Sequence, residues 1–254
     1  MTILVILSCI GLLSFLWMRA EAYFTRIRFH TYSNESTQTN RSARILFVSD
    51  LHRRKISDAW LQKHFTNIDL CILGGDALEH GVAVEQLKHN IQALRAIAPV
   101  VYVWGNNEGE VGIDACRHAM QSVPDVIELS NESRIFSTKE GLVLQIIGMD
   151  DLNERRCDVD KAFEKVSDDM GIDVAVCHNP AVLQFVRDKQ WNLLMSGHTH
   201  GGQIRLFGWG LYPKGKWSKF ADGRVHLVSN GFGTTKLPLR LGAPAEIHHI
   251  TILQ

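Results

Sequence analysis

Residues 192–204 read NLLMSGHTHGGQI. The stretch begins as a short apolar run, which is typical of a buried β-strand, and ends in two histidines at positions i and i+2 between glycines. Side chains with this spacing project in the same direction, and the glycines leave open backbone around His198 and His200. The stretch therefore predicts a strand whose carboxyl end delivers two imidazoles to one place.

Four other short apolar runs end in a polar side chain that can bind a metal ion. They are RILFVSD (44–50), LCILGGD (70–76), VVYVWGN (100–106) and VAVCH (174–178). Their last residues are Asp50, Asp76, Asn106 and His178. Strands of an open α/β sheet present their carboxyl ends at one edge, so we expect these side chains to converge there with His198.

The apolar runs alternate with amphipathic stretches, of which residues 82–97 show the clearest helical period. This alternation predicts a layered α/β domain. After residue 200 the pattern changes: QIRLF, RVHLVSN and EIHHITIL are expected to be strands linked by loops, with no helix between them.

Composition limits the class of protein. The chain has 254 residues, with 27 basic and 27 acidic side chains, so it carries no net charge with which to wrap nucleic acid. An apolar fraction of 45% excludes a disordered chain. The five cysteines are widely spaced and form no C-x-x-C pair, which argues against a disulfide framework or a zinc ribbon. We expect no protein partner from these features.

The amino terminus predicts a membrane anchor. Residues 2–18 contain no charged side chain, and this length is at the lower limit for a spanning helix. A cleaved signal peptide is the alternative, because residues 20–22 (Ala-Glu-Ala) offer a small-x-small site. Basic residues follow the run but do not precede it, which favours a single-pass protein with a cytoplasmic domain. We expect an anchor over residues 1–19, a linker over 20–43 and a domain over 44–254.

Taken in order, the motifs D-x-H, G-D, G-N-x-E, H and G-H-x-H resemble those of the calcineurin-like metallophosphoesterase family. The resemblance implies a four-layer αββα sandwich. GHTHGGQI (197–204) and SNGFGTTKLPLRLGAPAEI (229–247) are similar to a bacterial, membrane-associated branch related to lipid-linked pyrophosphatases and small phosphodiesterases.

The resemblance also implies a site for two metal ions. One ion would be held by Asp50, His52, Asp76 and His200. The second would be held by Asp76, Asn106, His178 and His198, with Asp76 bridging the pair. Carboxylate, imidazole and amide donors suit Mn, Fe or Zn better than Ca. Two divalent ions and two carboxylates leave a positive site, which favours an anionic phosphoester substrate.

One position departs from the family pattern. Many members carry histidine directly after the G-N pair, where it is taken to protonate the leaving oxygen, but this chain has Asn107. An amide can donate a hydrogen bond but cannot transfer a proton near neutral pH. We therefore expect Asn107, His178 and His198 to act in catalysis on leaving groups that need little protonation, such as those of a pyrophosphate or an aryl ester.

These patterns predict an enzyme that hydrolyses a phosphodiester or pyrophosphate bond, with a lipid-linked substrate as one candidate. The alternatives are a nucleotide or nucleic-acid phosphodiesterase and a metal-binding scaffold without activity. The loop LFGWGLYPKGKWSKF (206–220) interleaves aromatic residues with lysines. This pattern suits either contact with a bilayer interface or a hairpin that only forms a rim over the site.

Overall fold

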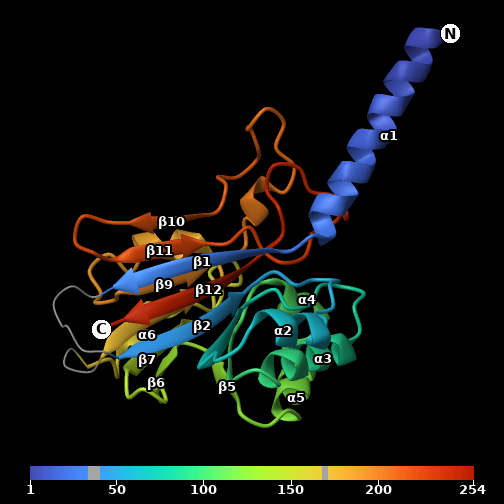
Figure 1. Cartoon of the computed structure of the whole chain (residues 1–254). Helices are drawn as coiled ribbons and strands as arrows, with labels where there is room; N and C mark the ends of the chain where they lie inside the picture. The colour runs from blue at the N-terminus through green and yellow to red at the C-terminus, as the bar shows by residue number, and fades with distance from the viewer. Residues whose placement is uncertain (34–40, 168–170) are drawn as a thin grey trace.

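The computed structural model describes residues 1–33, 41–167 and 171–254. Two six-stranded mixed sheets lie face to face (Figure 1). The order of strands in the first sheet is β1-β12-β2-β3-β4-β5, and in the second it is β10-β11-β9-β8-β7-β6. In the first sheet β2 to β5 run parallel, and β12 pairs antiparallel with β2 and parallel with the edge strand β1. In the second sheet β11, β9, β8 and β7 run parallel, and an antiparallel pair forms each edge.

The strands of the first sheet come from both ends of the chain. Their bounds are β1 (Arg26–Ser33), β2 (Ser42–Val48), β3 (Leu70–Gly74), β4 (Val100–Val103), β5 (Val126–Leu129) and β12 (Glu246–Leu253). Those of the second sheet are β6 (Glu132–Ser137), β7 (Val143–Met149), β8 (Ile172–Cys177), β9 (Leu193–Ser196), β10 (Lys216–Lys219) and β11 (Val225–Val228).

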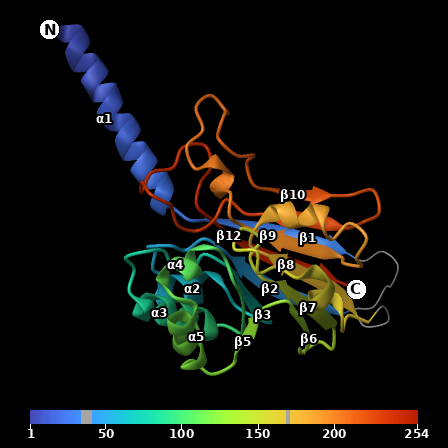
Figure 2. The ribbon, with the colours of Figure 1, turned by 180° about the vertical axis from the view of Figure 1, so that it is seen from behind.

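The helices cover the outer faces of the two sheets (Figures 1 and 2). The first sheet is covered by α2 (Asp58–His64), α3 (Val84–Arg95), α4 (Asn107–Val111) and α5 (Ile113–Gln121). The second is covered by α6 (Val159–Phe163) and the 3₁₀ turn η1 (Pro180–Gln184). A third apolar core lies between the sheets. These layers confirm the predicted αββα sandwich, and α3 confirms the predicted helix.

The helix α1 (Thr2–Tyr23) projects away from the sheets (Figures 1 and 2). It is long and apolar enough to cross a membrane, with a mean hydropathy of 2.1 and no burial in its most apolar window. This finding rests on length and composition alone, which a signal sequence would also satisfy.

Two sequence predictions are wrong in detail. The expected linker over residues 20–43 contains β1, which pairs in parallel with β12, and residues 34–40 of it lie outside the described residues. An edge strand is held mainly by backbone hydrogen bonds, which a polar sequence forms as well as an apolar one. The expected strand QIRLF is not a strand either; its Ile204 forms only isolated bridges, after a 3₁₀ turn η2 (His200–Gly202).

Candidate metal centre

The predicted site residues lie together at strand ends of both sheets. Asp50 and His52 follow β2, Asp76 follows β3, and Asn106 follows β4 in the first sheet. His178 follows β8, and His198 and His200 follow β9 in the second sheet. The expectation that one edge of one sheet would carry them all is therefore wrong. The two carboxyl edges meet because the sheets pack against each other through a common core.

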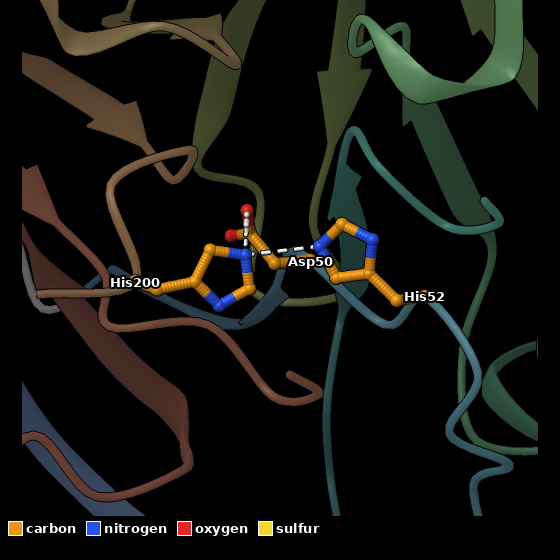
Figure 3. Close-up of side chains that lie close together, drawn as sticks. All are labelled: Asp50, His52 and His200. Carbon is orange, nitrogen blue, oxygen red and sulfur yellow. Dashed lines mark hydrogen bonds and ion pairs between the residues drawn. The ribbon is translucent and has the colours of Figure 1, made fainter. Parts of the chain in front are cut away.

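The side chains form two clusters with metal-binding geometry, Asp50–His52–His200 and Asp76–His178–His198. In the first cluster His200 Nε2 lies 2.9 Å from His52 Nε2 and 3.4 Å from Asp50 Oδ1 (Figure 3). Asp76 connects the clusters, because its Oδ2 atom lies 3.2 Å from His178 Nε2 and 3.9 Å from His52 Nε2.

Two buried polar atoms at this site lack a hydrogen bond. Among the described residues, only four buried side-chain nitrogen or oxygen atoms have no such partner, and they include Asn106 Oδ1 and His178 Nε2. His178 Nε2 contacts only carboxylate oxygens, of which that of Asp76 is the nearer at 3.2 Å, and Asn106 Oδ1 has no hydrogen-bond partner. Buried polar atoms are nearly always hydrogen-bonded, so these two atoms call for another explanation. Both atoms can donate a lone pair to a cation, so the donor set fits a metal ion here.

Hydrogen bonds on the far side of the imidazoles select the nitrogens that face the site. His52 Nδ1 lies 3.3 Å from Glu79 Oε2, and His178 Nδ1 lies 2.9 Å from the carbonyl oxygen of Gly74. Both partners can only accept, so each Nδ1 carries the hydrogen in its pair. The Nε2 atoms are then left to face the site, as in metal-binding histidines.

The two aspartates are also held in place. The Ser49 hydroxyl donates to Asp50 Oδ2 at 2.6 Å, and the backbone N–H of His198 donates to Asp50 Oδ1 at 3.0 Å. Asn107 donates twice to Asp76, from its backbone N–H at 2.9 Å and from its side-chain amide at 2.6 Å. These donors fix the carboxylates before any ligand arrives.

The backbone at the site is strained. Five of the seven predicted ligands have left-handed φ angles between 50° and 71°. They are Asp50, His52, Asp76, His198 and His200. Each such residue costs on the order of 1–3 kcal/mol, and this strain concentrates at functional sites.

Glycines precede three of the ligands because other parts of the site approach them closely. A Cβ atom at Gly75 would lie 2.7 Å from His178 Nδ1. A Cβ atom at Gly105 would collide with the Asp76 carboxylate, and one at Gly197 would collide with the Asp50 carboxylate. The glycines of the G-D, G-N and G-H motifs therefore allow strand ends of two sheets to come together.

Burial and opposite charges set the ionisation of the site. Burial would raise the pKa of Asp76, but His178, His52 and the Asn107 N–H hold that pKa well below its usual range. Burial also opposes a charge on His178, yet Asp76 and Asp50 raise its pKa well above the usual value. A proton on His178 thus balances buried negative charge, which is what a metal ion would do in its place.

At His200, in contrast to His178, burial outweighs the nearby carboxylates and lowers the pKa to about 3. The ring is therefore neutral near pH 7, as a metal ligand must be. Arg240 holds this ring from behind: it is fully buried, its Nη2 lies 3.2 Å from His200 Nδ1, and it donates to the carbonyls of Asn230, Gly233 and Ala243.

Glu108 connects two loops at the site. Its buried carboxylate accepts from the N–H of Ala77 at 2.6 Å, the hydroxyl of Tyr102 at 2.7 Å and the N–H of Gly105 at 3.1 Å. It thereby ties the segment after β3 to the segment after β4. The next loop residue in contact with the site is Glu79, whereas its neighbour His80 is exposed.

Sequence reasoning missed Glu79, Ser49 and Arg240. Ser49 adjoins a ligand, and Arg240 lies in the stretch 229–247 that carried part of the resemblance. No local pattern distinguishes these residues from surface residues of the same type. Their contacts appear only when distant segments meet.

The clusters open into a cavity of about 440 Å³. Its polar wall contains His52, Asp76, Asn106, Asn107, His198 and His200. The rest of its lining includes the apolar side chains Ile204, Leu211 and Leu237, together with Tyr212, Lys236 and the polar residues Thr199, Gln203 and Thr235. The site is thus accessible from solvent and is bordered in part by apolar side chains.

Comparisons with known proteins identify the family of this chain. The uncharacterized protein YpbG of Bacillus subtilis (strain 168) is 36% identical over 241 residues, which is 92% of this chain and 90% of YpbG. The phosphodiesterase YaeI of Escherichia coli (strain K12) is 27% identical over 173 residues, or 64% of this chain and 62% of YaeI. The purple acid phosphatase PPD1 of yellow lupin aligns with 80% of this chain and 47% of its own, at 11% identity and a TM-score of 0.47. The family model of the calcineurin-like phosphoesterases matches residues 43–202, and the chain belongs to this family, whose members are metal-dependent phosphoester hydrolases.

Proposed function

We propose that the protein hydrolyses a phosphodiester or pyrophosphate bond with two divalent metal ions. The observation that carries this proposal is the pair of clusters joined through Asp76, with Asn106 Oδ1 and His178 Nε2 left without hydrogen bonds inside the protein. Two metal ions at such a site stabilise both the attacking and the leaving oxygen of a phosphoryl group.

We assign the first ion to Asp50, His52, Asp76 and His200, and the second to Asp76, Asn106, His178 and His198. Imidazole, carboxylate and amide donors favour Mn, Fe or Zn. The chain's own contribution is to hold the donors in a fixed geometry. Glu79 and the Gly74 carbonyl orient two imidazoles, and the Ser49 hydroxyl orients the Asp50 carboxylate.

Asn107 lines the cavity beside Asp76 and can donate a hydrogen bond to a phosphoryl oxygen, but it cannot supply a proton. His198 is the one ligand histidine that is only partly buried, and its Nε2 lies 3.3 Å from the Asn153 amide. Hydrolysis at this site therefore favours leaving groups of low basicity. A pyrophosphate or a diester with an aryl or phosphate leaving group meets this requirement better than a simple alkyl ester.

We propose a lipid-linked phosphoester as the substrate class and a single membrane-spanning helix, α1, as the anchor. The apolar side chains in the lining of the cavity and the uncharged run of α1 support this choice. Arg19, Arg26 and Arg28 follow the apolar run, which favours a cytoplasmic domain. Protease added to intact cells should leave the domain uncut, and digestion without lysis would reverse this orientation.

A hydrolysis assay with bis(4-nitrophenyl) phosphate tests the activity. The purified full chain in detergent should release nitrophenolate when Mn²⁺ is added and should stop when the metal is chelated. Elemental analysis of the same sample should give about two ions per chain. Two bound ions without turnover would favour the metal-binding scaffold, and no bound metal would reject the proposal.

A further inference from the structure

We propose that the loop of residues 206–212, called here the tip loop, inserts into the surface of the lipid bilayer beside α1, so that the cavity opens at the membrane. This inference deepens the proposed function and depends on it for the delivery of a lipid substrate. The membrane contact itself can be tested without activity.

The tip loop exposes large apolar side chains. Leu206 is 61% exposed, Phe207 101%, Trp209 84% and Leu211 84%. Single exposed apolar residues are ordinary on a protein surface, but four within six positions form a contiguous patch, which marks an interaction site. An aromatic pair flanked by leucines suits the interfacial region of a bilayer.

The tip loop is held in place rather than left loose. The guanidinium of Arg205 donates to the carbonyl oxygens of Gly201 at 2.9 Å, Tyr212 at 2.6 Å and Gly208 at 2.7 Å. The half-buried Arg205 side chain therefore closes the loop, whose apolar side chains are exposed. Phe207 adopts a left-handed φ of 50°, which a non-glycine residue adopts only where its surroundings impose it.

Hydrogen bonds connect the base of the tip loop with the end of α1. The backbone N–H of Arg205 donates to Leu241 O at 2.8 Å, and the N–H of Leu241 donates to Gln203 O at 2.9 Å. The neighbouring Arg240 N–H donates to Met18 O at 3.0 Å, within the last turns of α1.

A second contact fixes the same end of the helix. The Gly242 N–H donates to the buried Glu21 carboxylate at 3.1 Å. The carboxyl-terminal end of α1 is therefore docked on the domain by direct hydrogen bonds. Both views show the tip loop and α1 rising from the same side of the sheets (Figures 1 and 2).

The charges around this surface suit an anionic bilayer. Residues 203–220 and 229–242 contain no acidic side chain. They contain the exposed residues Lys214, Lys216, Lys219 and Lys236 and the half-buried Arg205, whereas their sixth basic residue, Arg240, is buried. The whole chain has no net charge, so the excess of positive charge is concentrated in these segments. Basic residues near a membrane surface are attracted by anionic lipids.

The cavity lies between this surface and the metal centre. Leu211 and Tyr212 of the tip loop line it together with Lys236 and Leu237, while His52 and His200 lie in its polar wall. A phosphoester in a lipid headgroup could therefore reach the metal centre while its acyl chains stay in the bilayer.

Quenching of tryptophan fluorescence by brominated lipids tests the contact directly. The full chain is reconstituted into vesicles of phosphatidylcholine and phosphatidylglycerol, with lipids brominated at carbons 6 and 7. Trp209→Phe should remove a measurable share of the quenched emission. As a control, Ile135→Trp on β6, at the opposite side of the domain in Figure 1, should add emission that is not quenched. Unchanged quenching in the Trp209→Phe protein would overturn the proposal.

A paired assay tests delivery of the substrate. The double variant Phe207→Ser/Trp209→Ser changes side chains that do not line the cavity. It should hydrolyse bis(4-nitrophenyl) phosphate at the wild-type rate and a vesicle-embedded lipid phosphoester at least tenfold more slowly. The control Ile135→Ser/Phe185→Ser should keep both activities. Equal rates of the tip variant and the wild type on vesicles would refute delivery by the tip loop.

A second copy of this chain is the competing occupant of the patch. Light scattering of the detergent-solubilised protein would then show a dimer that the tip variant dissociates, and this result would overturn the membrane assignment. If the wild type lacks activity on both substrates but Trp209 is quenched, the proposed function fails and the membrane contact stands.

Discussion

The Nδ1 atom of His52 lies 3.3 Å from Oε2 of Glu79, on the side of the imidazole opposite to the metal centre. Arg53 also contacts the Glu79 carboxylate and holds it in place. Glu79 is thus a positioning residue that fixes the hydrogen of His52 on Nδ1 and leaves Nε2 for the metal.

We predict that Glu79→Ala lowers the affinity for Mn²⁺ by about 10- to 100-fold, because the His52 ring loses its orientation. Titration of the metal-depleted full chain measures the affinity. Glu79→Gln, which can still accept the hydrogen bond, should restore part of it. His80, the exposed neighbour of Glu79, provides the control: the variant His80→Ala should bind Mn²⁺ like the wild type. Equal affinities of all three variants would contradict the role of Glu79.

We predict that Asn107 sets the preference for leaving groups. Replacement by histidine introduces a group that can transfer a proton, which contributes about 10²- to 10⁴-fold to rates that depend on it. We expect Asn107→His to raise kcat for an alkyl phosphodiester much more than kcat for an aryl phosphodiester. The side-chain amide also donates to Asp76 at 2.6 Å, so metal content must be measured alongside. The same gain on both substrates, at unchanged metal content, would contradict this explanation.

Gly197 allows β9 to approach the end of β2. A Cβ atom at this position would collide with the carboxylate of Asp50 and would lie 2.5 Å from Ser49 Oγ. We expect Gly197→Ala to displace Asp50, to reduce the bound metal and to destabilise the fold by about 1–3 kcal/mol. Gly109→Ala is the matched control, because its nearest neighbours lie at 3.8 Å and it should keep the wild-type metal content. Full metal occupancy in Gly197→Ala would show that the site tolerates the added methyl group.

His226 makes the stability depend on pH. Burial, with a smaller effect of Lys216, lowers the pKa of His226 to about 4, whereas the usual value is 6.5. As the pH falls, His226 is protonated in the unfolded chain at a higher pH than in the folded chain. The contribution of neutral His226 to the free energy of unfolding is therefore fully present above about pH 6.5 and is lost as the pH falls toward 4. At pH 5 the loss from this residue is about 2 kcal/mol.

Urea unfolding of the full chain in detergent at pH 7 and pH 5 measures this effect. In His226→Leu the difference in unfolding free energy between the two pH values should shrink by about 2 kcal/mol relative to the wild type. His226 Nε2 lies 3.3 Å from Ser196 Oγ, so the variant also loses one weak contact, but that loss is the same at both pH values. If the difference in unfolding free energy between pH 7 and pH 5 is as large in His226→Leu as in the wild type, His226 does not cause the acid sensitivity.

The sequence determined the chemical identity of the site. Each predicted ligand follows an apolar run, and within each sheet the carboxyl ends of parallel strands place these residues at the same edge. The helix α3 and the apolar helix α1 were also predictable, since periodicity and composition are local properties of the chain.

Only the tertiary structure decided how distant backbone segments meet. It paired β1 with β12 through backbone hydrogen bonds, which carry little sequence information, within a stretch that reads as a linker. It also joined the carboxyl edges of two sheets at one site, brought Glu79 to His52, and docked the end of α1 on Arg240. These contacts depend on packing between segments far apart in the chain, so no local pattern of residue types encodes them.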